Sequence, residues 1–160
     1  MDRIDKILNH DLFLYHLERN NTAEADRRFC RHSMVHFLDV ARIGTIIALE
    51  EGLKIDREWI YAAALLHDCG KHEQYENGTP HEQASARIAP ELLKACGFND
   101  EETGVIVTAI SRHRDPEAAK EKNLNGILYR ADKASRACFA CDAKKDCNWK
   151  DGKKNLTIKY

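Results

Sequence analysis

The chain has 160 residues, of which 43% are hydrophobic and 32% are charged, a composition typical of one soluble globular domain. Its 25 basic residues are balanced by 26 acidic ones, and the resulting net charge of −1 argues against a broad nucleic-acid-binding surface. Charges near the N-terminus exclude a signal peptide and no apolar run approaches the ~20 residues of a membrane span, so we expect a cytoplasmic protein.

The first half of the chain is predicted to form helices, because caps and breakers divide it and no segment alternates as a strand does. A first amphipathic helix is predicted over residues 3–19, ended by the pair Asn20-Asn21. Residues 23–31 lead into a long helix over 32–51, which stops at Gly52. The pattern therefore predicts an all-α fold.

The second half continues in the same way. Asp56 is predicted to cap a helix that ends at Gly70, and Thr79-Pro80-His81-Glu82 is predicted to start another that runs to Gly97, with Thr79 as its cap. Two further helices are expected, one from Asn99 or Asp100 to about His113 and, after an interruption at Pro116, one over 124–139. We predict a single compact helical domain over residues 1–140, with a short irregular tail, residues 138–160, packed on it.

His67 and Asp68 stand side by side at the end of the apolar stretch from Trp59 to Leu66. Two ionisable side chains on a buried helix cost several kcal/mol unless something pairs with them. A neutral imidazole and an ionised carboxylate together suit divalent iron, manganese, zinc, cobalt or nickel, and the carboxylate can bridge two ions. A core histidine beside a helix cap is the alternative, and the pair alone does not decide between them.

A metal ion held by this pair needs further donors from other helices. His36 lies in a helix whose apolar residues Val35, Val40, Ile43 and Ile47 recur at helical spacing, which places it on or beside the core face. Asp132 similarly interrupts an apolar stretch, residues 127–131. Each alone is more often structural, but together they extend the pair to a possible ligand set.

In the order His36, His67-Asp68 and Asp132, the chain resembles the HD-domain metal-dependent phosphohydrolase superfamily over residues 32–136. His81 and His113 are similar to the extra ligands of its two-metal branches, and the bacterial branch that hydrolyses symmetrical dinucleoside polyphosphates is the most similar. The resemblance implies one ion on His36, His67, Asp68 and Asp132, and a second on His81 and His113 with Asp68 bridging. By their positions alone, His81 is a residue of a first helical turn and His113 a histidine at a helix C-terminus.

The resemblance also implies the chemistry. Water activated by one or two divalent ions would hydrolyse a phosphate ester or anhydride, with Asp68 as the central catalytic residue. Lys71, one turn beyond the pair, is a second catalytic candidate and can contact a phosphate as a point charge. Arg112 and Arg114 flank His113 and are candidates for phosphate recognition, and His72 is a reserve candidate for the general acid. The alternative role of each is that of an ordinary surface or loop residue.

Six cysteines in a cytoplasmic chain are expected to be thiols or metal ligands rather than disulfides. Cys30 lies six residues before His36 and Cys138 six residues after Asp132, about 9 Å along each helix. If the two helices are antiparallel, these cysteines become neighbours. The sequence therefore predicts a separate structural zinc or an iron–sulfur cluster, while reduced cysteines in a mobile tail remain the alternative. The proposed ligands are Cys30, Cys138, Cys141 and Cys147; Cys69 and Cys96 are expected to be packed thiols.

The leading hypothesis is a metal-dependent phosphohydrolase acting on a small phosphorylated substrate, with a nucleotide favoured. The alternative is a non-catalytic sensor or regulatory protein that binds a nucleotide or a metal. A nucleic-acid accessory protein is a third hypothesis, but the near-zero net charge and the lack of an aromatic and basic stripe argue against a polynucleotide partner. No membrane partner is expected, and the sequence does not indicate an oligomeric state.

Overall fold

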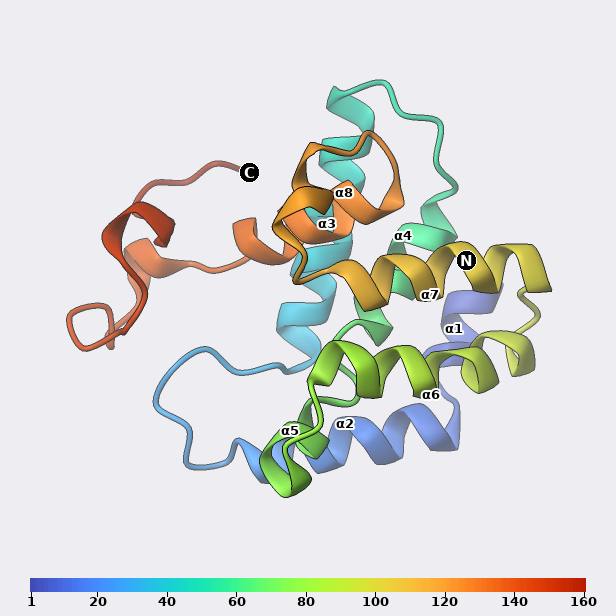
Figure 1. Cartoon of the computed structure of the whole chain (residues 1–160), viewed down its shortest axis with the longest axis horizontal. Helices are drawn as coiled ribbons and strands as arrows, with labels where there is room; N and C mark the ends of the chain where they lie inside the picture. The colour runs from blue at the N-terminus through green and yellow to red at the C-terminus, as the bar shows by residue number, and fades with distance from the viewer.

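The computed structural model describes all 160 residues, and its regular structure is entirely helical (Figure 1). The all-α prediction is confirmed. None of the helices combines the length and the hydrophobicity that a membrane crossing requires. The α-helices are α1 (Asp2–Leu8), α2 (Asp11–Ala23), α3 (Met34–Glu50), α4 (Arg57–Leu66), α5 (Lys71–Asn77), α6 (His81–Ala95), α7 (Asp100–Arg112) and α8 (Leu124–Ala134), with short 3-10 helices η1 (Pro116–Lys120), η2 (Cys138–Ala140) and η3 (Asp151–Lys153).

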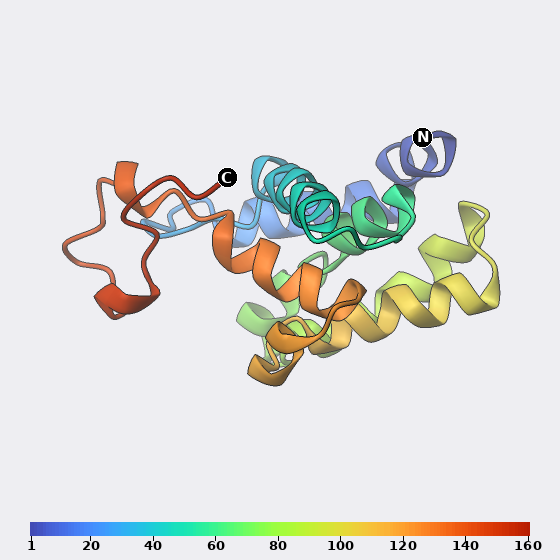
Figure 2. The ribbon, with the colours of Figure 1, turned by 90° about the horizontal axis from the view of Figure 1, so that it is seen from above.

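The core is built around α4, in which every residue from Ala62 to Leu66 is fully buried. Helices α3, α7 and α8 pack against it, and α6 covers α7. Gly44 of α3 lies where these helices meet, because a Cβ there would lie 3.0 Å from Ile60 and 3.2 Å from Ile127. A side chain at this position would therefore require the Ile60 and Ile127 methyl groups to move. The tail after α8 lies at one end of the bundle (Figures 1 and 2).

The predicted first helix is wrong in two ways. The helix is interrupted at Asn9 and divided into α1 and α2. His10 caps α2 by accepting a hydrogen bond at Nδ1 from the Leu12 amide, 3.2 Å away. At its other end α2 runs through the Asn20-Asn21 pair. Asn20 is buried, where it donates to the Asp68 carbonyl (2.9 Å) and accepts from the His72 amide (2.8 Å). These tertiary hydrogen bonds outweigh the weak preference of asparagine for ending a helix.

The long helix begins later than predicted, at Met34, and residues 24–33 form an irregular segment that leads into it. Val35, predicted on the apolar face, is 69% exposed. At the other end Gly52 has a φ of +64° and stops the helix close to the predicted residue. The segment 24–33 is held by side chains rather than by a helical hydrogen-bond ladder.

The predicted role of Gly70 is also wrong. Helix α4 ends at Leu66, and Gly70 is the N-cap of α5 with a φ of −87° rather than a left-handed residue. A Cβ at Gly70 would lie 2.8 Å from the Ala84 Cβ and 2.8 Å from the Ser85 amide nitrogen. Glycine is therefore needed for the close approach of this turn to α6. As a result, His67 and Asp68 lie in a turn between two helices.

The predicted cap Asp56 is confirmed at the start of α4. Of the two residues expected to start the next predicted helix, Asp100 is the first residue of α7, and Asn99 is its cap and forms a capping box with Glu102. Thr79 does not cap α6, since its hydroxyl donates instead to Asn77 Oδ1, 2.7 Å away. Pro80 precedes the first helical residue.

The last helix is shorter than predicted. It ends at Ala134, and residues 138–140 form the separate 3-10 helix η2. Asn155 of the tail caps the end of α8, because its Nδ2 donates to the carbonyl oxygens of Lys133 (2.8 Å) and Arg136 (2.9 Å). The tail is thus hydrogen-bonded to the C-terminus of α8.

His16 of α2 is buried against α5, with its Nδ1 2.9 Å from His72 Nε2. Burial, with His72 nearby, lowers the pKa of His16 to about 4. The unfolded chain therefore binds a proton below about pH 6.5 that the folded chain excludes, and stability is lost as the pH falls toward 4. We expect the free energy of unfolding of the wild type to fall by about 1 kcal/mol more than that of His16→Gln between pH 7 and pH 5, after allowance for solvent screening. Urea unfolding at both pH values measures the difference, and equal losses would contradict the prediction.

Candidate metal centre

Six buried polar side chains meet where the ends of five helices converge, the N-termini of α3 and α6 and the C-termini of α4, α7 and α8. These side chains are His36, His67, Asp68, His81, His113 and Asp132. Each stands in or next to a terminal turn, so the apolar middle of each helix packs in the core while its polar end faces this point. The structure thereby brings together all six histidine and aspartate residues that were predicted as metal ligands.

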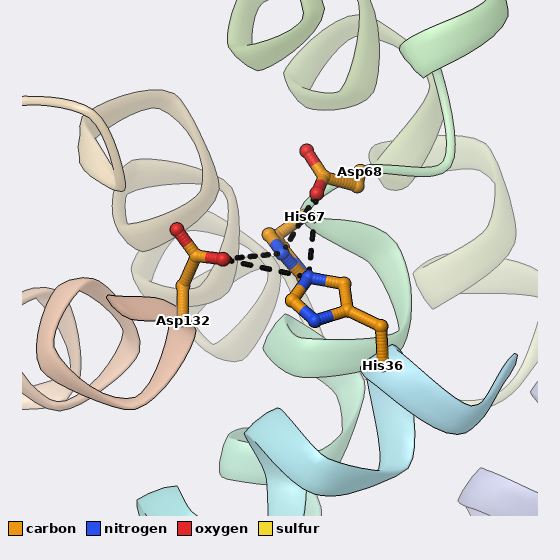
Figure 3. A group of neighbouring side chains, drawn as sticks. All are labelled: His36, His67, Asp68 and Asp132. Carbon is orange, nitrogen blue, oxygen red and sulfur yellow. Dashed lines mark ion pairs between the residues drawn. The ribbon is translucent and has the colours of Figure 1, made fainter. Parts of the chain in front are cut away.

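The first group consists of His36, His67, Asp68 and Asp132, which point toward one another in Figure 3. Asp68 Oδ2 lies 3.1 Å from His67 Nε2 and 3.6 Å from His36 Nε2. Asp132 Oδ1 lies 3.4 Å from His36 Nε2. One ligand atom from each residue lies within 4.8 Å of all the others, an arrangement that a single ion can bridge.

The second group consists of Asp68, His81 and His113. Here the other carboxylate oxygen, Asp68 Oδ1, lies 3.2 Å from His81 Nε2 and 3.6 Å from His113 Nε2. The two oxygens of Asp68 thus face different groups. This is the arrangement of a carboxylate shared between two ligand sets, although occupancy by two ions stays a prediction.

The imidazole rings are oriented for metal binding. Nδ1 of His67 donates to the Ala64 carbonyl (2.7 Å), and Nδ1 of His113 donates to the Ile110 carbonyl (2.7 Å). A carbonyl oxygen only accepts, so these bonds turn Nε2 toward the centre. His67 Nε2 and Asp68 Oδ1 are buried without a hydrogen-bond partner. Such atoms cost about 1–3 kcal/mol each, and a divalent cation would satisfy both.

The electrostatics of the first group also favour a cation. Burial alone would disfavour a charged imidazole, yet Asp68 and Asp132 raise the pKa of His67 to about 10. Despite their own burial, the pKa values of both carboxyls lie well below the ordinary range because histidines surround them. Two buried carboxylates thus favour positive charge at this point, which a divalent ion would supply.

His81 is suited to bind a metal as a neutral ligand. Burial lowers its pKa to about 3, and the nearby ammonium group of Lys71 also disfavours its protonation. Its Nδ1 lies 2.6 Å from Gln74 Oε1 and 3.1 Å from Lys71 Nζ. These contacts fix the ring with Nε2 toward Asp68.

A sequence profile of the family described as HD domain matches residues 34–137. The chain belongs to the HD domain family. An uncharacterized protein from Clostridium beijerinckii (strain ATCC 51743 / NCIMB 8052) is 49% identical over all 160 residues and the whole of that protein. The solved structure of a predicted HD superfamily hydrolase from an uncultured Thermotogales bacterium has a TM-score of 0.64 and 24% identity to this chain, covering 89% of this chain and 81% of that one. At this identity the likeness shows the fold alone.

The six residues His36, His67, Asp68, His81, His113 and Asp132 are called the HD centre below. A cavity of about 810 Å³ opens onto this centre. Asp68 and Asp132 are the only carboxylates in its lining, and every other lining residue with a permanent charge is basic. The chain as a whole carries a net charge of −1, so positive charge is concentrated here. The basic residues are Arg27, Lys71, Arg114, Lys133, Arg136, Lys150 and Lys153. Lys71 and Arg114, both predicted to bind phosphate, are therefore beside the HD centre.

Two other candidates are placed elsewhere. Arg112 pairs with Asp115 (2.7 Å) and Glu121 (2.6 Å) and does not line the cavity. His72 of α5 is buried against α2, where it is hydrogen-bonded to His16 and to Glu76 Oε1 (3.0 Å), and it does not line the cavity either. The structure therefore does not support Arg112 as a phosphate ligand or His72 as the general acid.

His32 is a residue beside the HD centre that the sequence did not indicate. Its Nε2 lies 3.7 Å from Asp68 Oδ2, and its Nδ1 is 2.5 Å from Glu24 Oε1. Burial opposes ionisation of Glu24, but the hydrogen bond with His32 lowers its pKa to about 2. The hydroxyl of Tyr75 also donates to Glu24. His32 stands in the irregular segment before α3, where helical spacing gives no signal.

Arg136 and Lys133 were also missed. Arg136 Nη2 lies 3.5 Å from Asp132 Oδ1 and 3.3 Å from His36 Nε2, and Lys133 pairs with the same carboxylate of Asp132. The i,i+4 spacing of Asp132 and Arg136 was a usable signal for this contact. Arg27, Lys150 and Lys153 lie in irregular segments, and nothing in their spacing placed them here.

The predicted cysteine ligands Cys30, Cys138, Cys141 and Cys147 all line a second cavity, of about 580 Å³, between the segment before α3 and the tail. They do not form a close group, since neither set of ligand atoms within 4.8 Å of one another includes a cysteine. Cys69 and Cys96 are buried in the core as expected, and burial raises the pKa of Cys69 to about 12. All six cysteines are free thiols.

Proposed function

We propose that this HD domain protein is a metal-dependent phosphohydrolase that cleaves an ester or anhydride bond of a small phosphorylated molecule. One observation carries the proposal: two ligand groups that share Asp68 border a cavity whose remaining charged lining is entirely basic. Such a lining attracts phosphate oxygens, while the ligand groups suit a divalent ion. Membership of the HD family supports the same chemistry.

Divalent iron, manganese, zinc, cobalt or nickel held by these groups would polarise a phosphoryl oxygen and lower the pKa of water. The chain's own residues bind and orient the substrate. Lys71 offers a buried point charge beside His81, and Arg136 offers a planar guanidinium that matches two phosphate oxygens at once. The contact with Glu24 holds His32 at Nδ1, so that Nε2 is available to hydrogen-bond a substrate in the cavity.

We favour a nucleotide as the substrate. The cavity volume falls within the range of about 300–1,000 Å³ typical of small-molecule sites. Tyr129 and Trp149 line it beside the basic residues, and aromatic rings of this kind stack on nucleobases. A symmetrical dinucleoside polyphosphate is the finer proposal within this class, and a cytoplasmic enzyme would meet such substrates.

The test is a phosphate-release assay on protein that has been stripped with a chelator and reloaded with each of the five metals in turn. The substrate panel includes nucleoside mono-, di- and triphosphates, dinucleoside polyphosphates and simple sugar phosphates. We expect hydrolysis of at least one nucleotide class by the reloaded protein and none by the stripped protein. If the protein binds metal and nucleotide but hydrolyses no substrate of the panel with any of the five metals, the alternative of a sensor would be favoured.

Lys71→Gln is expected to lower kcat/KM by about 10–100-fold, because a hydrogen bond to a charged group contributes roughly 1.5–3 kcal/mol. Metal content should be unchanged, since Lys71 belongs to neither ligand group and the shorter contact of the His81 ring, to Gln74 Oε1, remains. The matched control is Lys120→Gln, which changes a 73% exposed lysine that does not line the cavity and should keep full activity. Steady-state kinetics with metal analysis of each variant decide the matter. An unchanged kcat/KM, or a loss explained by missing metal, would rule out a direct role in phosphate binding.

A further inference from the structure

Four of the six cysteines come from two separate parts of the chain and line one cavity. Cys30 lies in the irregular segment before α3, and the other three, Cys138, Cys141 and Cys147, lie in the tail. Residues 24–33 and the tail occupy the same end of the molecule (Figures 1 and 2). All four cysteines also fall outside the matched HD domain, residues 34–137. The four thiols are therefore not part of the sequence that the family profile describes, although the cavity is also lined by residues of the HD domain such as His36 and Arg136.

The spacing of the thiols distinguishes between possible ligands. Around a single zinc ion, Zn–S bonds of about 2.3 Å bring tetrahedral thiolates to within about 3.8 Å of one another. No three of these sulfurs lie within 4.8 Å of one another, although the His and Asp residues of the same chain form two groups, of four and of three, that meet that criterion. The cavity that the cysteines surround measures about 580 Å³, far more than one ion occupies. Four thiolates set apart around a larger space suit a cluster of several metal ions.

The charge of the lining favours an anionic group. Only one carboxylate, Asp39, lines this cavity, against six basic residues: Arg27, Arg28, Arg31, Arg136, Lys144 and Lys154. Thiolates and the clusters that they bind are negatively charged, and neighbouring lysines and arginines stabilise them. The histidines His32 and His36 complete the wall toward the HD centre.

The tail has little else to hold it in place. Of its residues 138–160, only Cys138 and Ala143 are buried, and Phe139, Leu156 and Ile158 are all exposed. The direct bonds to the rest of the chain are those of Asn155 to the end of α8 and an ion pair between Asp146 and Arg28. A segment without an apolar core needs a covalent or metal cross-link to remain folded.

We propose that Cys30, Cys138, Cys141 and Cys147 hold an iron–sulfur cluster that fastens the tail to the segment before α3. The two cavities share lining residues, among them Arg27, His32, Arg136 and Trp149. The tail also places Lys150 and Lys153 at the HD cavity. The cluster thereby fixes part of the basic wall that faces the HD centre. Its presence does not depend on the proposed hydrolysis, because none of its four ligands belongs to the His and Asp groups.

The test is the purification of the full chain without oxygen, followed by measurement of iron, acid-labile sulfide and zinc, and by visible absorption and electron paramagnetic resonance of the reduced protein. Iron at the HD centre brings no sulfide, so sulfide is the readout specific to the cluster. We expect iron and sulfide together in the wild type and in Asp68→Ala, and loss of all sulfide in Cys141→Ala. The matched control Cys96→Ala removes a buried core thiol and should retain the cluster.

The consequence for the tail has its own measurement. Amide hydrogen exchange over residues 138–160 should be faster in Cys141→Ala than in Cys96→Ala, while exchange in α3 and α4 stays the same. This comparison also shows that the variant remains folded. Two results would overturn the proposal: zinc without sulfide in the wild type, lost in Cys141→Ala, or an anaerobic wild type that contains neither metal at the cysteines even after incubation with ferrous iron and sulfide.

Discussion

Asp68→Asn is expected to abolish hydrolysis and to lower metal binding at both ligand groups. Its two carboxylate oxygens face different groups, so one substitution weakens both. The amide is neutral, and it leaves the buried histidines without the negative charge that balances a divalent ion. Metal-ion catalysis contributes several kcal/mol, and each 1.4 kcal/mol is tenfold in rate, so we expect a loss in kcat/KM of at least ~1,000-fold.

The measurement combines elemental analysis with kinetics on the substrate found for the wild type. The control is Asp100→Asn, an exposed aspartate in the first turn of α7 that pairs only with Lys94, and it should keep both metal and activity. Circular dichroism separates a local loss of metal from global unfolding. A folded Asp68→Asn that still hydrolyses the substrate would place the chemistry outside the HD centre.

The fold class and four of the six metal-ligand candidates could be predicted because they rest on local signals. An apolar stretch ending in His67-Asp68 is visible without any tertiary information, as are His36 and Asp132 among apolar neighbours at helical spacing. His36, His67-Asp68 and Asp132 interrupt or end apolar stretches in the sequence, and each stands at a helix end in the structure. His81 and His113 were indicated only by the resemblance to the HD superfamily. The arrangement of six ligands from five helices follows from packing the apolar sides together.

The prediction of helix boundaries failed where a tertiary contact determines the local conformation. Gly70 was expected to end a helix, but its lack of a Cβ serves a close contact with Ala84 and Ser85 of another helix. Asn20 was expected to end the first helix, but its buried side chain bonds to Asp68 and His72. In both cases the residue type was informative, and the partner that gave it its role lay about 15–50 residues away, beyond the range of any periodicity.

The residues around the ligands were the hardest to predict. Arg112 and Arg114 are equivalent in the sequence, one on each side of His113. In the structure Arg112 forms ion pairs with Asp115 and Glu121 away from the cavity, whereas Arg114 lines the cavity. His32 and Arg27 lie on an irregular segment whose path depends on Glu24 and on the tail. Side chains on irregular segments carry no face that spacing could reveal, so the basic wall of the cavity emerges only from the structure.

Removal of the metal from the HD centre is expected to lower the thermal stability strongly. A ligand that binds only the folded chain stabilises it by about 4 kcal/mol when its concentration is 1,000 times Kd. For a chain of this size, each kcal/mol shifts Tm by roughly 2–4 °C, so stripping should lower Tm by about 10 °C. Scanning calorimetry of stripped and reloaded protein measures the shift. If stripping lowers the Tm of Cys141→Ala by the same amount as that of the wild type, the stabilising metal binds at the HD centre and not at the cysteine site.

The pH dependence of this shift has a definite sign. In the stripped protein Asp68 and Asp132 raise the pKa of His67 to about 10, so a proton on His67 stabilises the fold below about pH 6.5 and that contribution is lost as the pH rises toward 10. A metal ion must displace this proton, and metal affinity therefore rises with pH. The stabilisation on reloading follows this affinity, so the gain in Tm should be larger at pH 8 than at pH 6. In His36→Gln, which lacks one ligand of the first group, most of the gain should disappear at either pH. A gain that is larger at pH 6, or one that survives in His36→Gln, would mean that the stabilising ion binds elsewhere.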